Sequence, residues 1–373
     1  WTVDGNVTYN TEKTETTSSN LFTDLLQTAT NIPVERFANS GQAGHWTSYY
    51  NNPYWLRDNV RNQNRSDFVN LIGTLNYELN KNINFNYVAN VQTSSANGLS
   101  YTNGYVDLLQ VGGGDHTVIS SFDTSNSSAR NFYGDFLVNF DYMLTDKVSF
   151  KANIGNNIQD RLSTFTSVGG DNLTVPGLYN ISNITGDPRR SNGTTRSRRF
   201  SFFANVDLGY EDYLFLNLTG RQDWDSRFQG GEKDNYFYPS AGVSFIPTKA
   251  FEGLKSNTFN YWKVAASAVK VGNAGPLTAY QSELNYNPGS GYPFGDLNSF
   301  LPTQSPTNIG LSPEFMTTFE FTTNLGFFND RLTIDASIFQ TETTDLITNQ
   351  QLSAGTGITS QLTNIGQMTN KGL

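Results

Sequence analysis

Apolar and polar residues alternate strictly along much of this chain, and short polar turns interrupt the alternation. From Val69 to Leu79 the odd positions are apolar apart from one glycine, and the even positions between them are mostly polar. Asn80-Lys81-Asn82 breaks the pattern, which resumes from Ile83 to Val91. A period of two predicts β-strands, and two such runs joined by a polar turn predict a β-hairpin.

The same unit recurs along the chain. Together with a first strand at Trp1–Tyr9, the pattern predicts about eleven strands of roughly ten to thirteen residues. A tilted strand of about 9–11 residues is long enough to cross a bilayer. The remaining strands are expected at 134–142, 148–154, 200–210, 214–218, 241–245, 262–268, 319–327 and 332–338.

The expected connections differ in length at the two ends of the strands. One set is short, with the link after Pro247 as the exception, whereas the other set is long. Outer-membrane barrels have short periplasmic turns and long extracellular loops, and a soluble sandwich has no reason to gather its long loops at one end. The long connections are expected at 11–66, 95–131, 160–198 and 272–314, with a shorter one near 225–235.

Four tyrosines lie near the short turns, at positions 77, 142, 210 and 213. An interfacial girdle suits tyrosine, because its ring is apolar and its hydroxyl group bonds to water. The sequence therefore predicts an all-β fold, an antiparallel transmembrane β-barrel with short periplasmic turns and long extracellular loops. The alternative is a soluble sandwich in which these tyrosines belong to the core.

Composition removes several other classes of protein. The 373 residues include no cysteine, 15% charged residues, 14% aromatic residues and a formal net charge of -9. Without cysteine there is no disulfide framework and no thiolate metal site. The acidic balance argues against a nucleic-acid partner, and the aromatic content argues against disorder. No apolar run reaches 18 residues, so no transmembrane helix is expected.

The alternation assigns each strand residue of a barrel to one of two faces. Leu71, Leu75, Phe136, Val138, Phe140, Leu214 and Leu216 are expected to face lipid. The lumen is expected to be lined by Asn70, Thr74, Asn76, Glu78, Asp135, Asn139 and Asp141, and also by Asn205 and Asp207. Single acids that alternate with apolar residues are not the paired carboxylates of a catalytic site.

The sequence contains only weak signals for a catalytic, metal or phosphate site. His45 and His116 are the only histidines and lie in different long loops without metal-binding spacing, so neither a zinc site nor a catalytic triad is expected. Gly112–Asp115 lacks the Lys-Ser/Thr and helix of a phosphate loop, and is expected to be a loop tip. One basic cluster is expected to be a solvated loop or a contact with anionic outer-leaflet lipid; it comprises Arg189, Arg190, Arg196, Arg198 and Arg199.

The first long loop holds a concentration of aromatic residues. Ser18-Ser19-Asn20 in front of the apolar residues at 21, 22, 25 and 26 predicts a short helix that Pro33 would end. The aromatic residues that follow are Trp46, Tyr49, Tyr50, Tyr54 and Trp55. They form either a stacking surface for a ligand or partner protein, or a small core that orders the loop.

The chain resembles the barrel of the SusC/RagA family of TonB-dependent outer-membrane transporters of Bacteroidota. Several of the family's recurring sequence motifs occur in order over nearly the whole chain. Trp224-Asp225 and Trp262–Ser267 depart from the residues that the family usually has there, so the subfamily stays open. The matching motifs lie at 21–33, 52–55, 213–228, 238–245, 262–273, 311–320, 328–332, 343–347 and 364–372.

The resemblance implies a 22-stranded barrel with an N-terminal plug and a TonB-interacting segment. Trp1 already reads as part of a strand, and Leu373 stops on the approach to another. Residues 1–373 are therefore expected to be about half of a barrel, with the plug and the remaining strands outside this chain.

The same resemblance implies a protein of the cell outer membrane that is not an enzyme and needs no cofactor. It implies active import of an oligosaccharide or a peptide, driven by TonB through the absent N-terminal part, under the lid of a SusD-like lipoprotein. Outer-membrane lipid would surround the barrel. The second hypothesis is a structural subunit of a larger secretion or protein-insertion complex, with other subunits as partners. A third is a soluble adhesin, which explains the loop aromatics but not the loop asymmetry.

Overall fold

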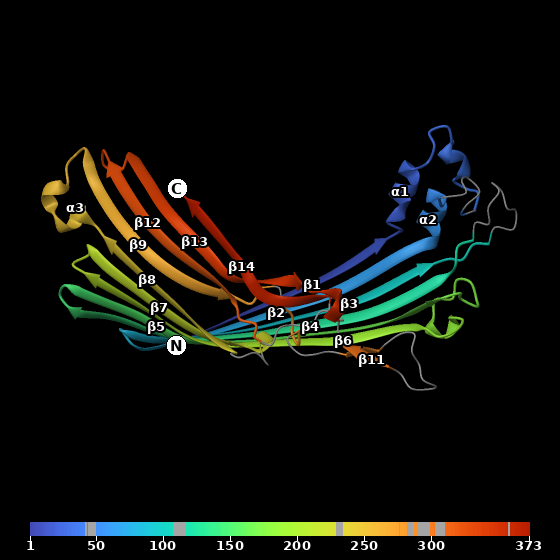
Figure 1. Cartoon of the computed structure of the whole chain (residues 1–373), viewed down its shortest axis with the longest axis horizontal. Helices are drawn as coiled ribbons and strands as arrows, with labels where there is room; N and C mark the ends of the chain where they lie inside the picture. Colours follow the sequence, from blue (N-terminus) through green and yellow to red (C-terminus); the bar gives the residue numbers. More distant parts are fainter. Residues whose placement is uncertain are drawn as a thin grey trace.

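Twelve strands form one antiparallel sheet in the computed structural model of the chain, which describes all residues except 42, 44–49, 107–116, 229–233, 276, 282–285, 289–298, 303–309 and 357–358 (Figure 1). Neighbours in the sheet follow chain order, from β1 at one edge to β14 at the other. The strands are β1 (Thr2–Thr16), β2 (Val60–Asn80), β3 (Ile83–Thr102), β4 (Ser121–Thr145), β5 (Val148–Asp171), β6 (Arg189–Tyr210), β7 (Leu214–Asp225), β8 (Asn235–Phe245), β9 (Phe259–Asn273), β12 (Glu314–Phe327), β13 (Leu332–Gln351) and β14 (Ser360–Gly372). This up-and-down sheet, left open in the chain, confirms the predicted all-β antiparallel fold.

The remaining elements are small. A two-stranded sheet pairs β10 (Tyr286–Pro288) with β11 (Phe300–Pro302). The α-helices are α1 (Asn20–Leu26), α2 (Pro53–Asn59) and α3 (Pro247–Ala250). Short 3₁₀ turns occur at Val34–Phe37, Ile181–Asn183, Ser226–Phe228, Glu252–Leu254 and Ala354–Thr356. None of the helices in the described ranges is long and apolar enough to cross a membrane.

The connections confirm the predicted asymmetry. At the α3 end, β2 and β3 are separated by residues 81–82, β4 and β5 by 146–147, and β6 and β7 by 211–213. The opposite end carries α1 and α2 (Figure 1), and its connections are mostly long, at 17–59, 103–120, 172–188, 226–234, 274–313 and 352–359.

The strands are longer than predicted, and there is one more of them. β4 and β5 have 25 and 24 residues, because they continue past the alternating segment into stretches that are polar on both faces, such as Ser125–Arg130. The additional strand is β14. Its apolar residues Leu362, Ile365 and Met368 are spaced by three, and β13 has a register shift opposite them, so a period of two is absent.

Candidate functional site

One face of the sheet, here called the apolar face, carries rows of apolar side chains in register. One row crosses from β3 to β12, and its members are Ile83, Phe140, Ala152, Val206, Leu218, Ala241, Ala268 and Phe319. Leu218 is 43% exposed and Phe319 is 59% exposed. A continuous apolar surface of this extent needs a non-aqueous neighbour. All seven residues expected to face lipid lie on this face.

The opposite face, here called the polar face, carries amides and hydroxyl groups. A row next to the apolar row above contains Asn84, Asn139, Asn153, Asn205, Thr219 and Ser240 in register. The residues expected to line a lumen all lie on this face, namely Asn70, Thr74, Asn76, Glu78, Asp135, Asn139 and Asp141, together with Asn205 and Asp207.

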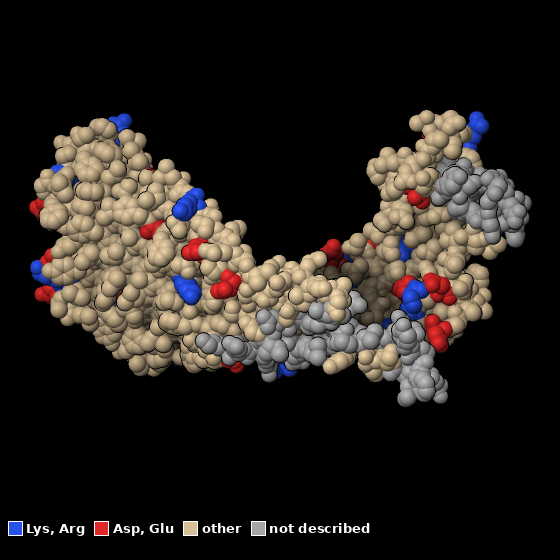
Figure 2. Space-filling model, viewed as in Figure 1, with Lys and Arg blue, Asp and Glu red and all other residues tan. Residues whose placement is uncertain are grey.

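Side chains on the polar face bond to one another between strands. Asn139 Nδ2 donates to Asn84 Oδ1 at 2.7 Å, and Asn90 Nδ2 donates to Asn70 Oδ1 at 2.7 Å. Thr219 Oγ1 donates to Asn205 Oδ1 at 2.9 Å. An amide keeps further donors and acceptors after one such bond, so the wall can still bond to water or to a polar solute. Figure 2 shows charged residues only sparsely over the visible surface.

Two ion pairs lie on the polar face near the long loops. Arg221 Nε contacts Asp223 Oδ1 at 2.6 Å, and its Nη2 donates to Ser201 Oγ at 2.7 Å. Arg227 contacts Asp225 at 2.6 Å. Both aspartates are buried, so the arginines must compensate the loss of hydration. Neither pair was predicted from the sequence, although spacing of i, i+2 within β7 places Arg221 and Asp223 on one face of the strand.

The Arg221–Asp223 pair borders a cavity of about 450 Å³ that is lined mainly by polar-face side chains, including Asp135 and Tyr238. The Phe203 ring lies 5.6 Å from the Arg221 guanidinium carbon, a cation–π contact. The Tyr238 ring lies against Gly272, where the Cβ of any other residue would collide with it. The cavity therefore combines aromatic rings with both signs of charge.

The first long loop is organised by α2, which begins at Pro53. The Asn52 side chain caps this helix by accepting the Tyr54 N–H at 3.0 Å, and its Nδ2 donates to the Phe37 carbonyl at 3.1 Å and to Ser40 Oγ at 3.2 Å. Asn52 is 1% exposed. This buried amide has hydrogen-bond partners for its oxygen and its nitrogen, and it joins α2 to the end of the Val34–Phe37 turn and to Ser40.

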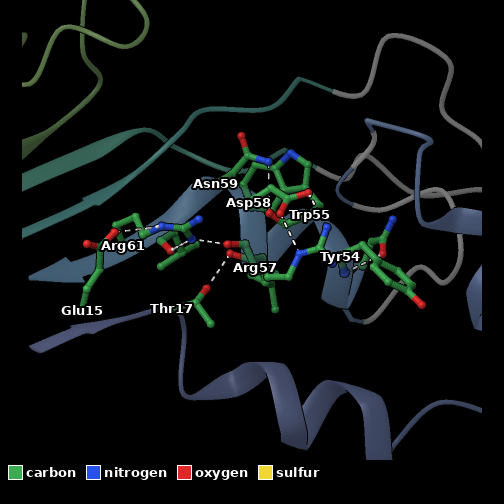
Figure 3. Close-up of polar contacts among 11 residues, drawn as sticks. Glu15, Thr17, Tyr54, Trp55, Arg57, Asp58, Asn59 and Arg61 are labelled. Atoms are coloured by element: carbon green, nitrogen blue, oxygen red, sulfur yellow. Dashed lines mark hydrogen bonds and ion pairs between the residues drawn. The ribbon is translucent and has the colours of Figure 1, made fainter.

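Polar contacts also join α2 to the sheet (Figure 3). Thr17 Oγ1 donates to the Leu56 carbonyl at 2.7 Å, and Asn103 Nδ2 donates to Asn59 Oδ1 at 3.0 Å. On the exposed side of α2, the Arg57 guanidinium donates to Asp58 and lowers the pKa of that carboxyl group. Contacts from the residues that directly follow β1 and β3 therefore hold α2 over the ends of the strands.

The structure separates the predicted loop residues. Trp55 is 5% exposed and makes an edge-on contact with Tyr105, with ring centroids 6.3 Å apart, so it belongs to the core of the loop. Tyr50 and Tyr54 are half-buried. Trp46 and Tyr49 lie outside the described residues, as do His45, His116 and Gly112–Asp115. A binding surface made of all five aromatic residues stays a prediction.

The arginine cluster lies within β6, so the prediction of a solvated loop is wrong. It was expected in a loop because no apolar alternation marks this part of the strand. Arg189, on the polar face, contacts Asp123 at 3.1 Å and Asp171 at 2.5 Å. Arg196 and Arg198 lie at even positions of β6, on the apolar face, and both contact Asp160.

A family model described as "TonB dependent receptor-like, beta-barrel" matches residues 1–373, which is the whole chain. The chain belongs to this family. Membership in the TonB-dependent receptor family confirms the barrel fold and the outer-membrane location. In a barrel, the apolar face of this sheet is expected to meet lipid and the polar face is expected to line the lumen.

Curated relatives match part of the chain. TonB-dependent receptor P26 of Formosa agariphila is 30% identical over 209 residues, which cover 52% of this chain and 20% of the relative. TonB-dependent receptor SusC of Bacteroides thetaiotaomicron is 27% identical over 194 residues, which cover 48% of this chain and 18% of SusC. The matches span about a fifth of the length of these relatives. They confirm the resemblance to SusC-type barrels.

Solved structures share the fold. The structure of the RagAB peptide transporter superposes with a TM-score of 0.75 at 17% identity, over 86% of this chain and 35% of that one. The ferric-catecholate import receptor Fiu from E. coli K12 gives a TM-score of 0.51 at 12% identity, over 99% of this chain and 52% of that one. At such identities the likeness concerns the fold alone.

Proposed function

We propose that this TonB-dependent receptor barrel belongs to a transporter that imports a large polar nutrient, an oligosaccharide or a peptide. The observation that carries the proposal is the row of amides and hydroxyl groups from Asn84 to Ser240 on the lumen face. A hydrated solute can exchange its water for these groups as it passes, and no covalent chemistry is needed. The RagAB structure that shares this fold is described as a peptide transporter, and a peptide belongs to this class of solute.

We further propose that energy reaches the barrel through TonB, and that a SusD-like lipoprotein covers the long loops. The first long loop supports the second point. Its described residues are held by the core around Trp55 and by the capped helix α2, so this part of the loop presents a fixed surface. A preordered surface loses less conformational entropy when a partner binds than a disordered loop does.

Affinity purification of the full-length protein from its own outer membrane tests the proposal. We expect a SusD-like lipoprotein to be recovered in about equal amount with the wild-type protein. Trp46→Ala combined with Trp55→Ala is expected to reduce this recovery, because Trp55 belongs to the core of the loop, while the barrel stays folded. Tyr77→Ala, near a periplasmic turn, is the matched aromatic control and should leave recovery unchanged.

Two outcomes would count against the proposal. Recovery of secretion or protein-insertion subunits in place of a lipoprotein would support the structural alternative. Equal recovery of the lipoprotein with the double tryptophan variant would remove this loop from the docking surface.

A further inference from the structure

A groove of about 620 Å³ opens on the apolar face, where the apolar rows end toward the long loops. Its floor is apolar and mostly aromatic, whereas the edge nearer the long loops is polar. The floor is made by Phe132, Ile158, Phe200 and Trp224, and the polar edge by Asp160, Arg198 and Ser226. A groove with one apolar side and one polar side suits an amphiphilic ligand, whose acyl chain would lie on the floor and whose headgroup would lie at the polar edge.

The floor is a built aromatic surface. The ring centroids of Phe200 and Trp224 are 5.7 Å apart, and those of Phe200 and Phe202 are 5.0 Å apart at right angles. Ile158 is 40% exposed and Phe202 is 52% exposed, so the surface remains open beside the packed rings. An acyl chain that lies on such a surface gains van der Waals contacts with the rings, because within the bilayer close packing and not loss of water drives association.

The polar edge is basic at its β4–β6 end. Arg196 contacts Asp160 through Nε at 3.1 Å and through Nη2 at 2.5 Å, and Arg198 Nε contacts the same carboxylate at 3.1 Å. Arg130 lies nearby, because its register partner Leu162 is also the register partner of Arg196. Asp234 lies beyond Trp224 at the other end of the groove. Three arginines beside one aspartate leave the β4–β6 end with surplus positive charge.

The depth of this edge in the membrane follows from strand geometry. Asp160 is twelve residues from Val148, which begins β5 beside a periplasmic turn. At about 3.3 Å per residue and a tilt near 40°, that distance spans about 30 Å along the membrane normal. The hydrocarbon core of a bilayer is about 30 Å thick. The edge therefore lies at the level of the headgroups of the outer leaflet.

We propose that this groove binds a phosphate-bearing glycolipid of the outer leaflet. Arg130, Arg196 and Arg198 bind the phosphate, because the guanidinium fork matches phosphate oxygens and is charged at every physiological pH. One acyl chain lies over the aromatic floor. Asp160 holds Arg196 and Arg198 in place, which reduces the side-chain entropy lost when the lipid binds. This site is separate from the solute path, which lies on the lumen face.

The test uses the full-length protein in nanodiscs of phosphatidylcholine that contain a small fraction of phosphorylated lipid A. Native mass spectrometry counts the lipid A molecules retained on the protein. We expect retention on the wild type and a loss of roughly tenfold or more in Asp160→Asn with Arg196→Gln and Arg198→Gln, since charge-assisted bonds are removed without leaving an unpaired acid. Arg189→Gln, on the same strand but facing the lumen, is the matched control and should retain the lipid.

One further variant and two further ligands test the proposal independently of the triple variant. Arg130→Gln alone should produce a smaller loss, and this variant leaves the Asp160 cluster intact if the triple variant does not fold. Lipid A without its phosphates should bind much more weakly, and millimolar inorganic phosphate should not displace the phosphorylated form, because phosphate alone lacks the chain. Equal retention of dephosphorylated lipid A, displacement by phosphate, or full retention by both the triple variant and Arg130→Gln would overturn the proposal.

Discussion

Ile154→Arg is expected to destabilise the folded barrel by about 2–4 kcal/mol, the cost of an arginine on the lipid face near the bilayer midplane. Ile154 is 52% exposed on the apolar face, and lies about halfway between the turn before Val148 and the basic edge at Asp160. Its register neighbours Val138 and Ala204 are apolar, so they offer the guanidinium no partner. Urea unfolding of the full-length protein in lipid vesicles measures the change.

The neighbouring residue provides a matched control for that variant. Asn153 lies next to Ile154 on β5 but belongs to the polar row, between Asn139 and Asn205. Asn153→Arg is expected to change the unfolding free energy by only a few tenths of a kcal/mol, because the new charge enters water in the lumen. Equal destabilisation by the two substitutions would contradict the assignment of the faces.

Asp223→Ala is expected to cost about 2–3 kcal/mol. Removing one partner of a fully buried ion pair costs about 3–5 kcal/mol, because the remaining charge loses its compensation. The Asp223 side chain is 12% exposed and that of Arg221 is 31% exposed, so solvent around Arg221 lowers the expected cost. The unfolding free energy of the variant in lipid vesicles gives the value.

A double substitution separates the ion pair from simple packing. Arg221→Met combined with Asp223→Ala should recover part of the lost stability, since no charge is left without its partner. The cavity of about 450 Å³ would then lose this ion pair but keep Asp135 and Tyr238. If the double variant is as unstable as the sum of the two single variants, the pair does not act as a unit.

The sequence was sufficient for the fold wherever one side of a strand meets lipid. Between Val69 and Val91 the apolar parity predicted the hairpin and the faces of its residues, and the register agrees up to the pair Glu78–Asn84. It shifts between Glu78 and Asn80, beside the turn. A lipid boundary forces this regularity, because a polar residue on the outer face costs free energy.

The failures lie where that boundary does not act. At the headgroups and beyond them both faces of a strand meet polar surroundings, so Ser125–Arg130 and the first half of β6 have no alternation and were predicted as loops. The 362, 365 and 368 spacing in β14 follows a register shift in β13, which a pattern with a fixed period of two misses.

Only part of the candidate site was predicted from the sequence, for a related reason. Composition and parity identified the amides of the polar face, because they repeat with the strands. Trp55 could not be assigned to a core or to a surface, since that depends on Tyr105 and Leu56, which a loop brings together only in three dimensions. The Arg221–Asp223 pair and the groove above Phe200 likewise depend on strands that are adjacent in space.

The most direct test of the account is the accessibility of single cysteines along β5. The chain has no cysteine of its own, so a thiol introduced at each position from 150 to 158 can carry a nitroxide label. In full-length protein in vesicles, even positions should be accessible to oxygen, which partitions into lipid, and odd positions should be accessible to a water-soluble nickel chelate. Accessibility that does not alternate with a period of two would contradict a lipid face and a polar lumen on this sheet.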